Sequence, residues 1–117
     1  MAKIVKMSDV AEVVHPDWLV KAGIRNYHEW VMSGDDKLNI VYANIEPGSN
    51  SGAPVAHEWT EEAAFVISGE LIYEIGGKRM KVGANESIFI PAGEVHFVKN
   101  ESDKPVLRIS IHMKKPA

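Results

Sequence analysis

The sequence predicts an all-β fold, a sandwich or a barrel, and three observations support this prediction. From Tyr27 onward the chain consists of short runs rich in β-branched and aromatic residues, separated by Gly, Pro, Asn, Asp and Ser. Gly76 and Gly77 lie between two of these runs, and glycine accepts the positive φ angles that a two-residue hairpin turn needs. No segment after Val20 has a sustained helical period. Short strands at this spacing are typical of antiparallel sandwiches and barrels.

The expected strands follow the apolar runs between the turn residues. Before His28 the chain is mixed: residues 3–7 can form a short strand, residues 8–14 can form a helical turn, and we interpret Pro16 as a break. Residues 47–52, rich in Gly and Ser, indicate a longer loop. Strands are expected at residues 27–32, 37–45, 63–68, 70–75, 78–82, 87–91, 96–100 and 105–113.

The composition indicates an ordinary globular protein with one domain, residues 1–117. Because cysteine is absent, a disulfide scaffold, a thiolate metal site and a cysteine nucleophile are excluded. The net charge of −3 and the lack of a clustered basic face argue against nucleic acid binding. The N-terminal stretch does not read as a signal peptide, and no apolar run has the length of a membrane span. We therefore expect a cytoplasmic protein that binds a small molecule, with no nucleic-acid or membrane partner.

Two blocks of the sequence carry residues suited to metal binding. His57 is followed by Glu61 and Glu62 at the entry to one expected strand, and His96 begins another strand just after a Pro-x-Gly turn. Two imidazoles and one carboxylate from different strands can form a facial metal site that leaves other positions open. Glu61 competes with Glu62 as the carboxylate, because a shift of one residue exchanges which side chain points inward.

The later block resembles the second motif of the cupin superfamily. Pro91, Gly93, His96 and Asn100 stand at the spacing of that motif, and Asn85 stands where the motif begins with Gly. Asn is the residue that most often replaces Gly in a left-handed turn, so the turn is expected to survive.

The earlier block resembles the first cupin motif in part. Glu62 and Gly69 match its second half, and His57 falls at the second of its two His positions. Val55 stands at the first His position and Ser49 at the leading Gly, so the chain retains two His and one Glu of the usual three His and one Glu.

The resemblance implies a double-stranded β-helix, the RmlC-like jelly-roll barrel, with its core over residues 39–113. It implies a divalent metal on His57, Glu62 and His96; iron, manganese, nickel, cobalt and zinc suit such donors alike. It also implies a homodimer that pairs through residues 1–30 and an outer sheet face. The family suggests a dioxygenase, decarboxylase, lyase or isomerase acting on a small keto or enol acid or sugar derivative. The alternative is a binding or sensor module for a small acid or sugar, without turnover.

Other residues are candidates for the pocket of such a barrel. The aromatic side chains Tyr42, Trp59 and Phe97 can line it, and Glu61, Tyr73 and His112 are candidates for a general acid or base.

The strand expected at residues 105–113 alternates between polar and apolar side chains. Arg108, Ser110 and His112 share one face, which we expect to look outward because antiparallel sheets commonly have one solvated face. If that face looks inward instead, Arg108 can clamp a substrate carboxylate and His112 can transfer a proton.

Overall fold

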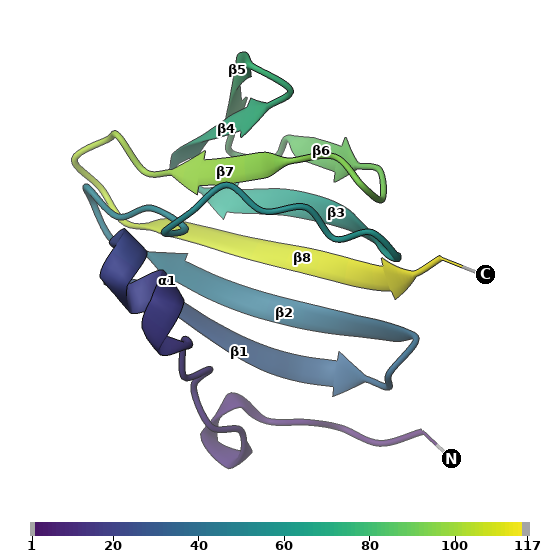
Figure 1. Ribbon diagram of the computed structural model, residues 1–117. Helices are drawn as coiled ribbons and strands as arrows, with labels where there is room; N and C mark the ends of the chain where they lie inside the picture. The colour runs from purple at the N-terminus through teal and green to yellow at the C-terminus, as the bar shows by residue number, and fades with distance from the viewer. Residues whose placement is uncertain (1, 116–117) are drawn as a thin grey trace.

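The computed structural model describes residues 2–115. Its strands form two antiparallel sheets (Figure 1). The larger sheet has the strand order β1-β2-β8-β3-β6, and the smaller sheet has the order β5-β4-β7. Buried residues of both sheets form one core, so the predicted all-β jelly-roll barrel is confirmed. The strands are β1 Tyr27–Gly34, β2 Leu38–Ile45, β3 Thr60–Ser68, β4 Glu70–Ile75, β5 Lys78–Gly83, β6 Ser87–Ile90, β7 His96–Lys99 and β8 Val106–Lys114.

The N-terminal segment differs from the prediction. Residues 3–7 form no strand, and the expected helical turn is reduced to a 3₁₀ turn at Met7–Asp9. A short helix, α1 (Asp17–Ala22), follows instead of a break at Pro16. Pro16 caps this helix because its fixed φ and missing N–H are both tolerated at a helix start, and Gly23 closes the helix with a φ of +114°. Within residues 2–115, no helix has the length and apolar character needed to cross a membrane.

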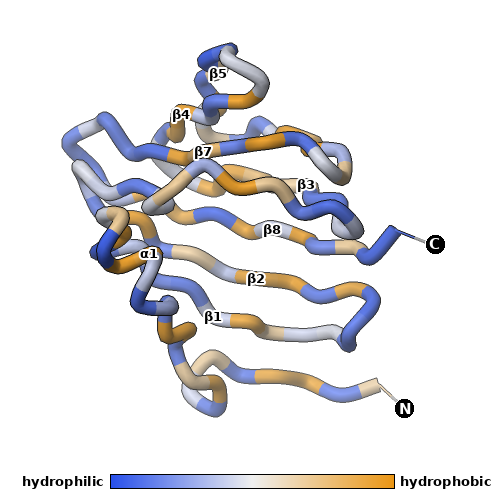
Figure 2. The backbone as a smooth tube through the Cα atoms, in the orientation of Figure 1, coloured by the Kyte–Doolittle hydropathy of each residue, from blue (hydrophilic) through white to orange (hydrophobic). Residues whose placement is uncertain are grey.

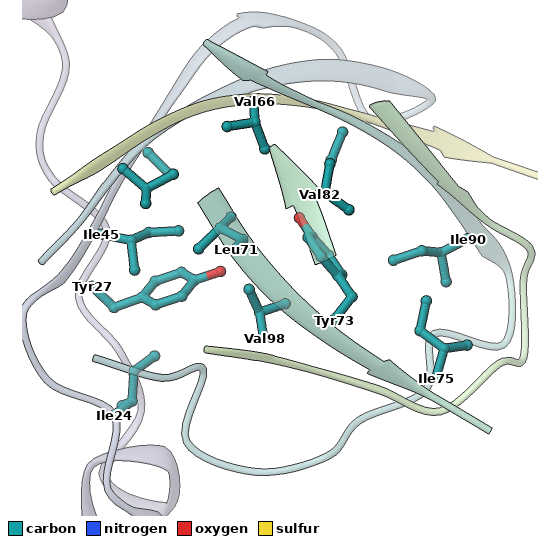
Figure 3. Close-up of a cluster of buried hydrophobic side chains, with 13 residues drawn as sticks. Ile24, Tyr27, Ile45, Val66, Leu71, Tyr73, Ile75, Val82, Ile90 and Val98 are labelled. Carbon is teal, nitrogen blue, oxygen red and sulfur yellow. The ribbon is translucent and has the colours of Figure 1, made fainter. Parts of the chain in front are cut away.

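Hydrophilic and hydrophobic residues are interspersed along the strands (Figure 2), and along β2, β3 and β8 buried residues alternate with more exposed ones, as strand geometry requires when one face is buried. Figure 3 shows buried side chains of both sheets meeting in the interior, among them Tyr27 and Tyr73. This alternation of burial holds on β2, β3 and β8, with β2 burying Val41, Ala43 and Ile45.

Strand β8 lies between β2 and β3, and the register of these three strands determines what surrounds its inward side chains. Opposite Arg108 are Ala43 on β2 and Val66 on β3. Opposite His112 are Asn39 on β2 and Glu62 on β3. The small or short neighbours of Arg108 leave space for a long polar side chain inside the barrel.

The turns use the residues that the sequence analysis identified. Gly76 and Gly77 connect β4 to β5 with φ angles of +56° and +79°, which confirms the predicted hairpin. Asn85 has a φ of +66° before β6, so it adopts the left-handed conformation expected of the residue that replaces the motif glycine. Gly69, between β3 and β4, has a φ of +85° and approaches the buried side chain of Val106.

Replacing Gly69 with Ala is expected to destabilise the protein more than replacing Gly76. Both glycines have positive φ, which costs an L-residue about 1–2 kcal/mol. Only at Gly69 would the added Cβ clash, at 2.8 Å from Val106 Cγ2. We therefore expect a loss of about 2–4 kcal/mol for Gly69→Ala and about 1–2 kcal/mol for Gly76→Ala in urea unfolding. Equal losses for the two variants would contradict the close approach at Gly69.

Candidate metal centre

A cavity of about 200 Å³ lies inside the barrel, and its wall combines polar groups from both sheets. Leu19 of α1 and Ile24, just after the helix, close part of it with apolar side chains. Among the barrel residues of this wall, those with a charge or a metal-binding nitrogen are Glu29, His57, Glu62, His96, Arg108 and His112. The structure thus brings His57, Glu62 and His96 to one cavity.

Glu62 places a buried carboxylate at the centre of this group. It points inward from β3 and is 7% exposed, while Glu61 lies on the opposite face of the strand, across from Met113. Glu62 Oε1 lies 4.0 Å from His96 Nε2 and 3.8 Å from His112 Nδ1. These distances are too long for hydrogen bonds, and no other donor within residues 2–115 hydrogen-bonds the carboxylate. A mostly buried carboxylate that faces the cavity and makes no hydrogen bond favours a cation at this position.

His96 presents a nitrogen lone pair to that carboxylate. The ring nitrogen Nδ1 lies 3.1 Å from the backbone oxygen of Glu94. A carbonyl oxygen only accepts, so Nδ1 carries the hydrogen, and in the neutral ring Nε2 is left unprotonated. Holding one imidazole nitrogen with a hydrogen bond is how proteins commonly orient a histidine toward a metal.

His57 is held beside His96 by the backbone. The amides and carbonyls of Val55 and His96 exchange two hydrogen bonds of 3.0 and 2.8 Å, and the two imidazole centroids lie 5.4 Å apart. Partial desolvation of the exposed His57 lowers the pKa of its imidazole, and the nearby His96 ring lowers it further, against the opposing effect of Glu62. A lowered pKa keeps the ring neutral near pH 7, which is the form that binds a metal.

The donor set fits a divalent ion in its chemistry, and small side-chain movements would be needed to bind one. Within residues 2–115, no three His, Asp or Glu side chains already stand in the arrangement of a metal site. Neighbouring ligands with bonds of about 2.1 Å to one ion lie roughly 3 Å apart, so each of the gaps at Glu62 must close by about 1 Å. Imidazole and carboxylate donors suit iron, manganese, nickel, cobalt and zinc.

Arg108 is buried in the same cavity, so the predicted outward orientation of the polar face of β8 is wrong. It is 2% exposed, and Nη1 donates hydrogen bonds of 2.9 and 3.1 Å to the hydroxyls of Tyr27 and Tyr73. Nη2 lies 3.6 Å from Glu29 Oε2, and Nε has no hydrogen-bond partner in the described residues. The inward orientation is tolerated because these hydroxyls and this carboxylate compensate the charge.

Tyr27 and Tyr73, whose side chains are labelled in Figure 3, hold Arg108 from opposite sheets. Burial raises the pKa of both phenols, which Arg108 only partly opposes, so both remain hydroxyls at neutral pH. Tyr73 is fully buried and is not part of the cavity wall. It can therefore support Arg108, but it is not placed to act as an acid or base on a bound molecule. The sequence analysis missed Tyr27 and Glu29. Tyr27 is the buried first residue of β1, and Glu29, two residues later, lies on the same face of the strand.

The other candidates for the pocket lie outside its wall. Tyr42 points outward from β2 and packs against Trp30 at a centroid distance of 6.0 Å. Phe97 points outward from β7, with the Lys99 ammonium 5.7 Å from its ring centroid. Trp59 precedes β3 and is 57% exposed. Strand alternation explains Tyr42 and Phe97, because their immediate neighbours in the chain are the buried residues.

Comparison with known proteins identifies related sequences and folds. The family model described as "Cupin domain" matches residues 41–112. A mannose-1-phosphate guanylyltransferase of Salmonella muenchen is 33% identical over 90% of this chain, but the chain spans only 24% of that protein.

Two solved structures illustrate the fold similarity. A sugar phosphate isomerase from a cupin superfamily of Silicibacter pomeroyi has a TM-score of 0.79 at 18% identity, covering 96% of this chain and 76% of that one. A predicted oxalate decarboxylase of Thermotoga maritima has a TM-score of 0.77 at 16% identity, covering 96% of this chain and 99% of that one. At these identities the similarity establishes the fold alone.

Removing the guanidinium of Arg108 is expected to be strongly destabilising. Arg108→Met leaves Glu29 without its partner and should cost about 3–5 kcal/mol in chemical unfolding. Adding Glu29→Gln to that variant should recover part of the loss, because it removes the uncompensated carboxylate. A loss below about 1 kcal/mol for Arg108→Met would contradict the role of this buried network.

Proposed function

The chain belongs to the cupin family, and on that premise we propose that it is a metal-dependent enzyme acting on a small oxygen-rich acid or sugar derivative. The observation that carries this proposal is the buried Glu62 carboxylate, which has imidazole nitrogens near it and no hydrogen-bond donor in the described residues. His57, Glu62 and His96 would hold the ion. When bound, a divalent ion in such a site supplies Lewis-acid chemistry or a place for dioxygen to bind.

With a divalent ion bound, the charges of the cavity wall would favour an anionic substrate. The wall carries one cation, Arg108, and two carboxylates, Glu29 and Glu62, so with neutral imidazoles its formal charge is −1. A divalent ion changes this to +1, which a singly charged acid would balance. Arg108 is suited to orient the acid because its guanidinium is fixed by Tyr27 and Tyr73 and its planar fork matches a carboxylate or phosphate.

The cavity also suits a substrate that is small and shielded from water. Its volume of about 200 Å³ lies below the range of about 300–1,000 Å³ that is typical of drug-sized ligands. The apolar side chains of Leu19 and Ile24 cover it near the barrel interior. Exclusion of water strengthens each electrostatic interaction inside, so the protein groups named above would act on a substrate more strongly than they would at the surface.

The second candidate function is a binding module without turnover. It is favoured by two observations: Val55 replaces one histidine of the first motif, and the gaps around Glu62 are wider than in a formed metal site. In a metal-free cavity Arg108 would then orient a small acid or sugar, and the net negative charge of the wall suits the uncharged sugar better. The two functions are distinguished by whether the purified protein requires a metal to retain its ligand.

Metal binding is expected to depend on Glu62 and not on its neighbour Glu61. Purified protein dialysed against Mn²⁺ should retain about one ion per chain by plasma mass spectrometry. His57→Ala, His96→Ala and Glu62→Gln should each lower the affinity by more than the roughly 10–100-fold effect of losing a residue that only supports a ligand. Glu61→Gln is the matched control and should bind like the wild type, because Glu61 lies on the outer face of the same strand. A wild type that stays metal-free would support the binding module instead.

We also propose that a second copy of the chain covers the outer face of the larger sheet. Apolar residues form continuous rows across this face: Tyr42, Ile109 and Phe65 are neighbours in one row, and Ile111 and Phe89 belong to the next. Phe89 is 54% exposed in the single chain, and Phe65 is exposed as well. An exposed apolar patch of this kind is typical of an interface.

Phe65→Glu is therefore expected to shift the protein from dimer to monomer. A charge placed within the apolar rows would have to be buried at the interface, which is unfavourable. Light scattering coupled to size-exclusion chromatography should report a dimer for the wild type and the smaller mass for the variant. Met80→Glu, an exposed apolar position on the smaller sheet, is the control and should remain dimeric. A monomeric wild type would refute the proposed dimer.

A further inference from the structure

We propose that His112 is an additional metal ligand, supplied by strand β8 in place of the histidine that the first motif lacks at Val55. This inference rests on the proposed metal site of His57, Glu62 and His96. It changes the role expected of His112 from proton transfer to coordination, and it completes a set of three imidazoles and one carboxylate.

The sheet register brings His112 to Glu62. The two residues are direct cross-strand partners on β8 and β3, and both side chains point inward. His112 Nδ1 lies 3.8 Å from Glu62 Oε1, slightly nearer than His96 Nε2 at 4.0 Å. Both imidazoles therefore approach the same carboxylate oxygen, and His112 does so with the shorter gap.

Val55 explains why the site needs a donor from elsewhere. Its side chain also lies in the cavity wall, but an isopropyl group has no electron pair to donate. Without another residue, the protein would offer only His57, Glu62 and His96. His112 reaches the same cavity from the neighbouring strand, with Nδ1 3.8 Å from Glu62 Oε1, so it can supply the imidazole that Val55 lacks.

The orientation of the His112 ring resembles that of His96. Nε2 of His112 lies 3.2 Å from the hydroxyl oxygen of Ser110, a fully buried residue on the same inward face of β8. If Nε2–H donates to this oxygen, Nδ1 is unprotonated and faces Glu62. His96 has the converse arrangement, with Nδ1 held by a carbonyl and Nε2 facing Glu62. In each ring one nitrogen is held and the other faces the carboxylate, as in metal-binding histidines.

A direct hydrogen bond between His112 and Glu62 is the competing arrangement, and it would make His112 a proton-transfer group. At 3.8 Å the two groups form no hydrogen bond in this structure, and either role would bring them about 1 Å closer together. The two roles predict different effects of removing the imidazole. A ligand contributes to metal affinity, whereas a group that only transfers protons does not.

The test measures Mn²⁺ affinity by titration calorimetry and counts imidazole nitrogens on the bound Mn²⁺ by pulsed electron paramagnetic resonance. Wild type should show three imidazole nitrogens. His112→Ala should show two and, like the other ligand variants, should weaken Mn²⁺ binding by more than the roughly 10–100-fold effect of losing a supporting residue. Adding Val55→His to that variant should restore the third nitrogen and most of the affinity, because Val55 lies in the same cavity wall. His28→Ala, on the outer face of β1, is the control and should match the wild type.

Each outcome separates this inference from the proposed function. If His112→Ala keeps the wild-type affinity and nitrogen count while His57→Ala and His96→Ala lose both, His112 is not a ligand and the three-residue site stands. If none of these variants changes Mn²⁺ binding, the proposed metal site itself is wrong. Thermal unfolding without metal verifies that His112→Ala is folded. Ser110→Ala, which removes no ligand, is a second variant, and unchanged Mn²⁺ affinity in it would contradict the orientation proposed for His112.

Discussion

A row of polar side chains on the central strand β8 is the constraint around which the barrel interior is organised. Arg108, Ser110 and His112 all point inward, and Arg108 brings a full charge into the barrel interior, where it is 2% exposed. That charge has to be compensated inside the protein. Tyr27 of β1 and Tyr73 of β4 accept its hydrogen bonds, so one guanidinium connects the two sheets. A purely apolar interior would pack the same barrel, but it would have no fixed charge with which to orient an anion.

Strand β8 contributes both a charged group and an imidazole to the cavity. His112 lies four residues beyond Arg108 on the same face, and its cross-strand partner is Glu62. The groups proposed to orient an acid and those proposed to hold a metal are therefore set by one register between β8 and β3. A slip of β8 by one residue in this register would turn Arg108 and His112 outward, away from Glu62. The backbone bridge between Val55 and His96 adds the remaining imidazole, that of His57, from the loop before β3.

Much of the fold could be predicted from the sequence because its signals are local. Gly76 and Gly77 predict a turn because glycine accepts positive φ angles, and the alternation of polar and apolar side chains at residues 105–113 predicts a strand. Alternation gives the period of a strand but not which face is inside, and this is why the orientation of Arg108 was predicted wrongly. Helix α1 has six residues, too few to show a helical period, so its Pro was interpreted as a break. Tyr27 was missed as a partner of Arg108 because 81 residues separate them in the chain.

The most direct test of the account is anomalous diffraction from crystals of the wild-type protein grown with Mn²⁺, recorded where manganese scatters anomalously. The account predicts one strong peak inside the barrel, at about 2.1–2.3 Å from a Glu62 oxygen and from the ring nitrogens of His57 and His96. It further predicts that Glu62 and the imidazoles lie closer together than they do without the ion. A peak elsewhere on the protein, or an occupied cavity that holds only an organic acid against Arg108, would contradict the metal centre.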